Sequence, residues 1–321
     1  KQQFILPTNV TKTRLDVFLS EEMDSTRSQI KKMIDRGQVS VNGELPKKSG
    51  DNIKAGDIVV VDTEKKVENV PSMAQEKSLA DFDVQIIKET KDYIVVNKPA
   101  GLLIHPTEAD EPVSLAAWML EKYPEIKNVG DSKVRPGIVH RLDKEASGLL
   151  VVARKQKMFD HLKKQFQERT VYKEYAVLVY GNIEKRHDTL DFDVDRGKNG
   201  QMVSRPKIDK MKLKNVGKDQ PGKDALTEFW KEKEYVRFTL LKVKIHTGRT
   251  HQIRVHMYAF NHPVVGDKIY YNKNLVKKSD KALSRLFLHS KKLCFKNLKD
   301  EEKCFEVGLP EELENYLEKL K

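Results

Sequence analysis

The chain has 321 residues, with 60 Lys and Arg against 48 Asp and Glu, and therefore a formal net charge of +12. Its length predicts about two domains, because a single hydrophobic core stops growing at about 250–300 residues. A hydrophobic share of 38% excludes wholesale disorder, and no apolar run approaches the ~18 residues that a membrane span needs. The basic excess favours a polyanionic partner.

Two cysteines, Cys294 and Cys304, are too few for a disulfide framework or a four-ligand zinc site. A reducing, cytosolic environment fits this cysteine content best.

Residues 13–62 have the pattern of a small helix-and-hairpin domain. A first helix is predicted from Thr13, and a second that ends at Gly37, where a C-cap glycine belongs. Asn42-Gly43 is a strong hairpin-turn signal, and residues 57–62 supply a closing strand.

Basic side chains cluster within this segment although its net charge is near zero. Six of them are candidate phosphate contacts: Arg27, Lys31, Lys32, Arg36, Lys47 and Lys48. The alternative interpretation is an ordinary solvated helix face.

The same segment resembles an S4 RNA-binding domain. The matching residues are Arg14-Leu-Asp with Phe18-Leu19, Ser25-x-Arg27-Ser-Gln-Ile30, Ile34, Gly37-x-Val39-x-Val41-Asn-Gly43 and Gly56-Asp57. The resemblance implies binding to structured RNA by residues 13–62. The polar residues 63–80 then read as a linker, and residues 81–317 as a second domain.

The second domain mixes strands and helices without a strict βαβ alternation. Strands are predicted at residues 84–87, 93–96, 149–153, 175–179, 238–245 and 287–289. Helical patterns lie near 114–123, 157–168 and 250–260, and the polar stretch 185–225 reads as a long loop or hairpin excursion. The pattern predicts an α+β fold around a large sheet.

A polar loop between two apolar runs carries His140, Arg141, Asp143 and Lys144. Functional residues concentrate on loops that rigid neighbours hold in place. Asp143 is the one central carboxylate, so a paired-carboxylate glycosidase site is not visible here. The simpler alternative is a surface ion pair of Asp143 with an arginine, worth ~0–1 kcal/mol.

Lys173 and Tyr175 are two residues apart and therefore share a face of their predicted strand. Tyr175 is either a plain sheet aromatic or a stacking face for a nucleic-acid base, which is worth ~1–3 kcal/mol.

Residues 245–257 combine arginines and histidines at a strand-to-helix turn, with Thr250 as the predicted N-cap. The histidines are five residues apart, so they share neither a helix face nor a strand face, and no metal site is predicted. Arg249 and Arg254 are predicted to hold a phosphate or a carboxylate.

Four ordered segments resemble the RluA/RluD group of pseudouridine synthases. They are Asn97-Lys-Pro-x-Gly101 with His105-Pro106, His140-Arg-Leu-Asp143, Lys173-x-Tyr175 and Thr247-Gly-Arg-Thr-His-Gln-Ile-Arg-Val-His256, followed by Gly266-Asp267 and Leu288-His-Ser290. The resemblance implies a large mixed, mainly antiparallel sheet with flanking helices. Leu288-His is followed by Ser where the group often has Ala, a mild departure.

The resemblance also implies residue roles. Asp143 would be the catalytic aspartate and Arg254 its countercation. Tyr175 would pack against a flipped base, Arg141 would fill the vacated stack, and Leu288 would floor the pocket. We assign His140 and Arg249 to further RNA contacts.

The sequence therefore predicts a monomeric, cytoplasmic enzyme that isomerises uridines in structured RNA without cofactor, metal, membrane or protein partner. Large-subunit ribosomal RNA is the favoured substrate, and a tRNA-directed enzyme is an alternative. A non-catalytic RNA-binding or ribosome-assembly protein would also explain the first domain and the charge. A nuclease that uses His251 or His256 as base is a further alternative, but the sequence shows no second acid–base residue or metal-ligand set to act with that histidine.

Overall fold

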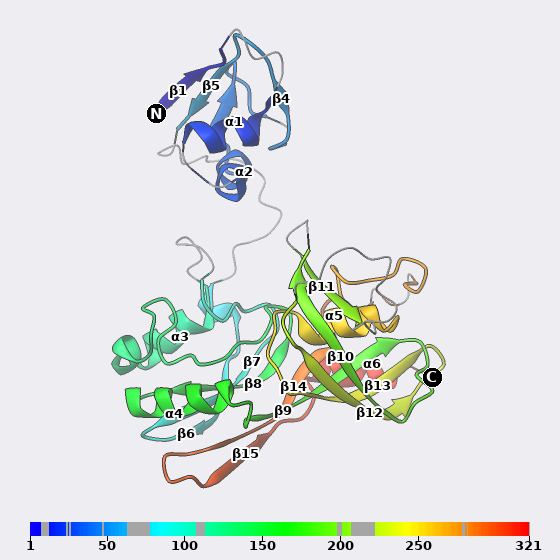
Figure 1. The fold of residues 1–321 in the computed structure, drawn as a ribbon. Coiled ribbons are helices and arrows are strands. Elements are labelled where there is room, and N and C mark those ends of the chain that lie inside the picture. The colour runs from blue at the N-terminus through cyan, green and yellow to red at the C-terminus, as the bar shows by residue number, and fades with distance from the viewer. Residues whose placement is uncertain are drawn as a thin grey trace, which may run out of the picture. The chain divides into compact units, whose positions relative to one another are not determined.

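The computed structural model divides the chain into two compact units, Lys1–Glu76 and Lys77–Lys321 (Figure 1). The residues that it describes are 1–7, 13–23, 25, 27–46, 48–62, 78–106, 113–197, 201–206, 222–277, 280 and 282–320, with the backbone alone at 28, 32, 205 and 206. Residues 63–77 of the predicted linker lie outside this set.

The first unit is built from two short helices and five short strands within the described residues. They are β1 (Gln2–Ile5), β2 (Thr13–Arg14), α1 (Leu15–Glu22), α2 (Arg27–Asp35), β3 (Val39–Val41), β4 (Asn52–Ile53) and β5 (Ile58–Val61). β5 pairs antiparallel with both β1 and β3, and β2 pairs with β4. The predicted turn is confirmed: Asn42 and Gly43 both have positive φ, 52° and 88°, as a type I′ hairpin requires.

The second unit begins with a single helical turn and ends with a helix. Its elements are η1 (Leu79–Asp81), β6 (Gln85–Glu89), β7 (Tyr93–Lys98), α3 (Leu115–Lys122), η2 (Pro124–Asn128), β8 (Ser147–Ala153), α4 (Gln156–Gln167), β9 (Tyr172–Tyr180), β10 (His187–Arg196), β11 (Met202–Pro206), β12 (Leu226–Glu234), β13 (Phe238–Ile245), α5 (Gln252–Ala259), β14 (Leu288–Lys296), β15 (Glu302–Glu306) and α6 (Glu311–Glu318).

One large sheet dominates this unit (Figure 1). Its strand order is β11-β10-β12-β13-β9-β14-β8-β7-β6, and β15 pairs with β14 outside this path. Within the described residues β14 and β8 are its one parallel pair, and the other pairs are antiparallel. The predicted α+β class with a mixed, mainly antiparallel sheet is confirmed.

The strand β9 lies in the middle of the sheet and is buried on both faces. Val177 and Val179 belong to the main core, which also receives side chains from α3, α4 and α5. Leu178 and Tyr180 point to the other face, where they pack with residues of α6. Because side chains alternate along a strand, Lys173 and Tyr175 share the face of α3, α4 and α5.

Several strands escaped the prediction because their sequences are polar. The stretch 185–225 forms the hairpin of β10 and β11 within its described residues, which agrees with a hairpin excursion. β12 begins at Leu226, and its alternate residues Thr227 and Phe229 are buried while its far end is charged and exposed. β15 is short and lies at the sheet margin, so its apolar signal is weak.

Cys294 and Cys304 form a disulfide, which the cysteine count did not predict. They lie directly opposite each other in the β14–β15 pair, with a Cα–Cα distance of 4.1 Å. Strand register, which the sequence does not reveal, brings them together. In the described part of the chain, every helix falls short of the length and apolar character that crossing a membrane would require.

Gly148 is placed where the parallel pair β8–β14 needs close backbone approach. Its φ is +115°, and a Cβ atom there would lie 2.3 Å from the carbonyl oxygen of Ser290. We expect Gly148→Ala to lower the free energy of unfolding of the second unit by about 3 kcal/mol or more, through backbone strain and overpacking. The shift in the urea midpoint of tryptophan fluorescence measures this, because Trp118 and Trp230 both lie in that unit.

The matched control is Gly308→Ala, where a Cβ atom would meet nothing within 4 Å. We expect this variant to unfold at the wild-type midpoint or slightly above it. Equal midpoints for both alanine variants would contradict the strain argument.

Candidate active site

Asp143 lies on the loop that leads into β8, and 14% of its side chain is exposed. Its Oδ2 accepts a hydrogen bond from Nη1 of Arg254 at 3.2 Å. In the described part of the chain its Oδ1 accepts no hydrogen bond. One carboxylate oxygen is therefore held and the other is free to meet a ligand.

Arg254 is in turn held by a second carboxylate, that of Asp267. Its Nε and Nη2 donate to the two oxygens of Asp267 at 2.7 and 2.9 Å, and the Asp267 side chain is fully buried. Asp267 also accepts the backbone N–H groups of Ile269 and Tyr270. Burial alone would lower the pKa of Arg254, but the hydrogen bonds and charge of Asp267 outweigh it and raise that pKa above its ordinary value.

The first turn of α5 fixes Arg254 in this position. Gln252 accepts hydrogen bonds from the Thr247 hydroxyl and the Arg249 N–H, and its amide donates to β12. The residue before the helix is His251, which has a left-handed backbone with φ 55°. The predicted N-cap, Thr250, is therefore wrong: the cap position is His251, whose side chain makes no capping hydrogen bond.

Lys98, at the end of β7, binds the backbone of the loop that carries Asp143. It was not predicted as a site residue. It is fully buried, and its Nζ donates to the carbonyls of Pro99, Leu102 and Lys144 at 2.8, 2.9 and 3.2 Å. Burial lowers its pKa to about 7. From sequence alone, the Asn97-Lys-Pro run has the pattern of an ordinary turn at the end of a strand. The signal that could have identified Lys98 is a lysine at the end of an apolar strand.

Three buried polar side chains form a connected row of contacts at the start of β8. Nη2 of Arg285 donates to the Ser147 hydroxyl at 2.6 Å, and the same hydroxyl contacts Nδ1 of His289 at 2.8 Å. Burial lowers the pKa of Arg285 and lowers that of His289 to about 4. This row of contacts ties β8 to β14 where they begin their parallel pairing.

A small cavity of about 60 Å³ opens beside Asp143. Its walls include four of the predicted pocket residues, Arg141, Tyr175, Arg254 and Leu288. Tyr175 is buried, and burial together with the Asp143 charge raises the pKa of its hydroxyl, so the ring is neutral at physiological pH. Arg141 is exposed and makes no side-chain hydrogen bond or ion pair within the described residues.

His140 is held by contacts within the protein rather than presented as a charge. Its Nε2 accepts the N–H of Val151 at 3.0 Å, and its ring stacks on Phe166 with centroids 4.5 Å apart. Burial, and then the Lys173 charge, lowers its pKa to about 3. A neutral ring can contact RNA by its face or its other nitrogen, but it offers no cation to a phosphate.

The three histidines of residues 245–257 face different neighbours. His246 contacts Glu228, His251 contacts the Tyr270 hydroxyl, and His256 contacts the Phe192 carbonyl. Among the described residues no group of three or more His, Cys, Asp or Glu side chains could hold a metal ion. His251 lines the small cavity beside Asp143, a place that its spacing alone did not predict.

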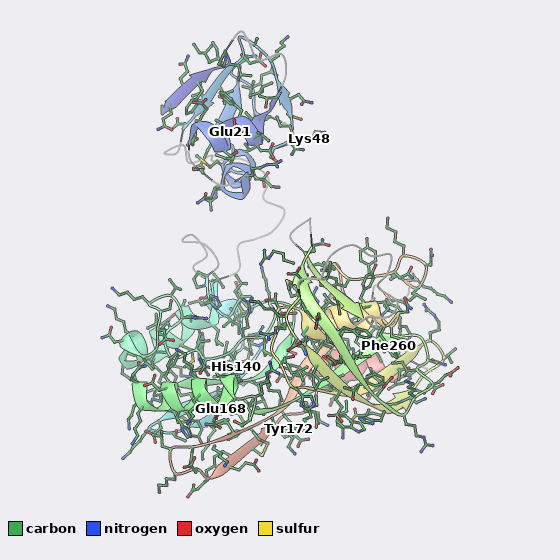
Figure 2. All side chains as sticks on the ribbon, in the orientation of Figure 1. Glu21, Lys48, His140, Glu168, Tyr172 and Phe260 are labelled. Atoms are coloured by element: carbon green, nitrogen blue, oxygen red, sulfur yellow. A yellow bond between two sulfur atoms is a disulfide. The ribbon has the colours of Figure 1, made fainter. Side chains whose placement is uncertain are left out.

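The basic residues of the first unit differ in how available they are. Arg27 makes an ion pair with Asp16 at 2.9 Å, and Lys31 makes one with Asp35 on the same helix. Lys48 has an exposed side chain (Figure 2). Of the other predicted contacts, Arg36 lies just beyond α2, whereas Lys47 and the side chain of Lys32 lie outside the described residues.

Family models match both units. The model described as RNA pseudouridylate synthase matches residues 92–259, and the S4 domain model matches residues 13–59. Asp143, Tyr175 and Arg254 fall within the first match.

Named relatives and solved structures agree with these models. An uncharacterized RNA pseudouridine synthase of Aquifex aeolicus is 39% identical and covers 80% of this chain and 76% of its own length. The ribosomal large subunit pseudouridine synthase D of Borreliella burgdorferi is 35% identical, covering 91% and 84%. The structure of human RNA pseudouridylate synthase domain containing 4 aligns with a TM-score of 0.59 at 24% identity, over 74% of this chain and 94% of that one, and so supports the fold.

Asp267 offers a test of the buried ion pair. Asp267→Asn keeps the side-chain volume but leaves the buried Arg254 charge without its main partner. We expect the free energy of unfolding of the second unit to fall by about 3–5 kcal/mol, read from the urea midpoint of tryptophan fluorescence.

The control is Glu125→Gln, which removes a comparable but exposed arginine partner, that of Arg154 at 2.6 Å. Exposed pairs contribute ~0–1 kcal/mol, so this variant should unfold close to wild type. If Asp267→Asn lowered the free energy of unfolding by as little as Glu125→Gln, the burial of the Arg254 charge would not depend on Asp267.

Proposed function

The chain belongs to the RNA pseudouridylate synthase family, and we propose that it isomerises uridines of large-subunit ribosomal RNA with Asp143 as the reacting carboxylate. The observation that carries the proposal is the geometry of Asp143, half of whose carboxylate is fixed by Arg254 and half of which is free beside a cavity. The relative from Borreliella burgdorferi, named for the large ribosomal subunit, supports the substrate class.

The reaction needs few groups. The bond between N1 of uracil and C1′ of ribose breaks, a bond between C5 and C1′ forms, and the proton on C5 leaves while N1 gains one. Product and substrate have equal mass, and no electron is gained or lost. One positioned carboxylate, a countercation and a surface for the base are sufficient, so the proposal requires no cofactor.

The cavity supplies these groups. Arg254 holds Asp143 in one orientation, and the Tyr175 ring offers a flat face to the uracil. Leu288, at the start of β14, contributes an apolar wall. Arg141 is exposed at the rim and is the residue we propose to occupy the space that a flipped uridine leaves. Extruding the base costs a few kcal/mol, which contacts in the pocket repay.

We propose that the S4 unit supplies affinity for structured RNA and that the second unit performs the chemistry. Arg27, Lys31, Arg36 and Lys48 are the described members of the phosphate-contacting set. Arg27 and Lys31 would have to exchange their intramolecular carboxylates for phosphates, so they contribute less per contact than an unpaired lysine would. A single chain, acting in the cytoplasm without a protein partner, stays the expected functional form.

The alternatives are less well supported by the site. A non-catalytic RNA-binding protein does not need a buried Arg254 oriented toward Asp143. A nuclease would need an accessible histidine base. His256 is fully buried with its Nε2 on a backbone carbonyl, and His251, which lines the cavity, has its Nδ1 engaged by the Tyr270 hydroxyl.

The central prediction concerns Asp143→Asn. The amide keeps the shape of the side chain and an oxygen for Arg254, but it removes the reacting carboxylate. We expect pseudouridine formation on ribosomal RNA to fall by about 10³-fold or more, with RNA affinity close to wild type. Pseudouridine mapping of ribosomal RNA and tRNA from a deletion strain, complemented with each variant, measures this.

The control is Glu145→Gln, a carboxylate two residues along the same loop that does not line the cavity beside Asp143. It should restore the modification. Full activity of Asp143→Asn would refute the assignment of Asp143, and pseudouridine restored in tRNA instead of ribosomal RNA would refute the substrate class.

Removal of residues 1–76 tests the division of labour. Losing one of two linked binding modules should raise KM on structured RNA by about tenfold or more, with kcat nearly unchanged. The modified position should stay the same in steady-state assays with sequencing of the product. A different modified uridine would show that the S4 unit selects the site.

A further inference from the structure

A second cavity, which we call the flanking cavity, adjoins the one beside Asp143. Its volume is about 490 Å³, within the range of about 300–1,000 Å³ typical of ligand pockets. The two cavities share five wall residues, listed here: Arg141, Tyr175, Ile245, Gly248 and Arg249. A ligand that spans both would therefore pass directly from Asp143 into the flanking cavity.

The flanking cavity is strongly basic. Its cationic wall residues are Arg135, Arg141, Arg169, Lys173 and Arg249. Among the described residues that line it, none is Asp or Glu. Cavity walls of one charge sign concentrate ligands of the opposite sign, so the expected occupant is an anion.

Lys173 is the most informative of these cations, because 92% of it is buried and only 8% is exposed. Within the described part of the chain it makes no side-chain hydrogen bond and no ion pair, and its recorded contact is the Phe166 ring, 5.7 Å from Nζ. Burial, and then the Arg169 charge, lowers its pKa to about 8. The side chain lines the flanking cavity and has no protein acceptor among the described residues, so its three N–H donors are available to a ligand.

Lys98 shows how the fold satisfies a fully buried lysine with its own acceptors. Its Nζ donates to three backbone carbonyls, whereas the Nζ of Lys173 faces a cavity and an aromatic ring. The contrast indicates that Lys173 is kept for an external acceptor.

The position of Lys173 relates that acceptor to the reaction centre. Lys173 and Tyr175 lie on one face of β9, roughly 6.6 Å apart along the strand. A base against Tyr175 therefore has its neighbouring nucleotide within reach of Lys173. The stacked rings of His140 and Phe166 form another wall of the same cavity and offer an apolar surface.

We propose that the flanking cavity binds the nucleotide adjacent to the reacting uridine, with the phosphodiester of that nucleotide on Lys173. This inference rests on the proposed function, since it takes the same RNA strand as the ligand. Lys173 acts here as a binding residue and takes no part in bond making or breaking. A phosphodiester supplies the acceptor oxygens that Lys173 lacks.

The first test compares Lys173→Met with Lys233→Met, both made in the Asp143→Asn chain so that no turnover occurs. Lys233 is a matched control, because its Nζ also lies over an aromatic ring, 4.9 Å from that of Tyr235, but it is exposed and outside both cavities. Binding of a fluorescent ribosomal RNA fragment is measured by anisotropy. We expect Lys173→Met to weaken binding by about tenfold and to flatten the log K against log[salt] slope by about 0.7 units, and Lys233→Met to change neither.

The second test neutralises the phosphate instead of the lysine. A methylphosphonate is placed in turn at each linkage near the target uridine. At one linkage next to that uridine, we expect the neutral group to weaken binding by about tenfold with Lys173 present and to have no further effect in Lys173→Met. Such non-additivity identifies a direct contact and is not produced by general loosening of the fold.

Several results would overturn the inference. Full affinity of Lys173→Met, or equal methylphosphonate effects in both chains, would show that Lys173 contacts no phosphate. Competition by millimolar inorganic phosphate without any methylphosphonate effect would assign the cavity to a free anion. Lys173→Met could fail to unfold at the wild-type urea midpoint of tryptophan fluorescence. In that case Lys173→Gln replaces it, and the methylphosphonate scan is carried out on the chain that keeps Lys173. A scan in which no linkage weakens binding overturns the proposal.

The proposed function is judged separately, by pseudouridine formation in the chain with Asp143 intact. An active enzyme with an unaffected Lys173→Met variant refutes the flanking cavity alone. An enzyme that forms no pseudouridine refutes the proposed function.

Discussion

Arg254 stands between two carboxylates, and the arrangement of the site depends on this. Three of its nitrogens are used: two on the buried Asp267 and one on the partly exposed Asp143. A buried guanidinium is unfavourable unless it is paired, and Asp267 supplies that pairing independently of any ligand. Arg254 can therefore present its remaining donor to Asp143 as a fixed group. The planar fork of arginine makes this division possible, and a lysine could not reproduce it.

Asp143 and Arg254 are held in place by elements from different parts of the chain. Arg254 is set by the first turn of α5, which Gln252 ties to β12. Asp143 is set by a loop whose next carbonyl accepts hydrogen bonds from Lys98 and from the N–H of Gly101. The parallel pairing of β8 with β14 brings Leu288 to the same cavity. The geometry of the site therefore depends on how the strands of the sheet are paired. Gly148, which allows β8 and β14 to approach closely, contributes to both.

Buried cations in this unit are satisfied in three ways. Lys98 donates to backbone carbonyls, Arg285 to a hydroxyl and a carbonyl, and Arg254 to carboxylates. Lys173 has none of these acceptors among the described residues and lines a cavity instead. A cationic side chain that lines a cavity without a protein acceptor keeps its N–H donors for a ligand.

The sequence by itself determined the class of fold, the helix-and-hairpin character of the first unit and the segments that line the cavity beside Asp143. These features are local: turn residues such as Asn42-Gly43, helical spacing, and ordered motifs that carry Asp143, Tyr175 and Arg254. Only the tertiary structure decided the register of β14 with β15, the anchoring of Arg254 by Asp267, the burial of Lys98 and Lys173, and the neutral state of His140. Each of these depends on distances between residues far apart in the chain and on how much water the fold removes around a charge, and neither quantity is set by local sequence.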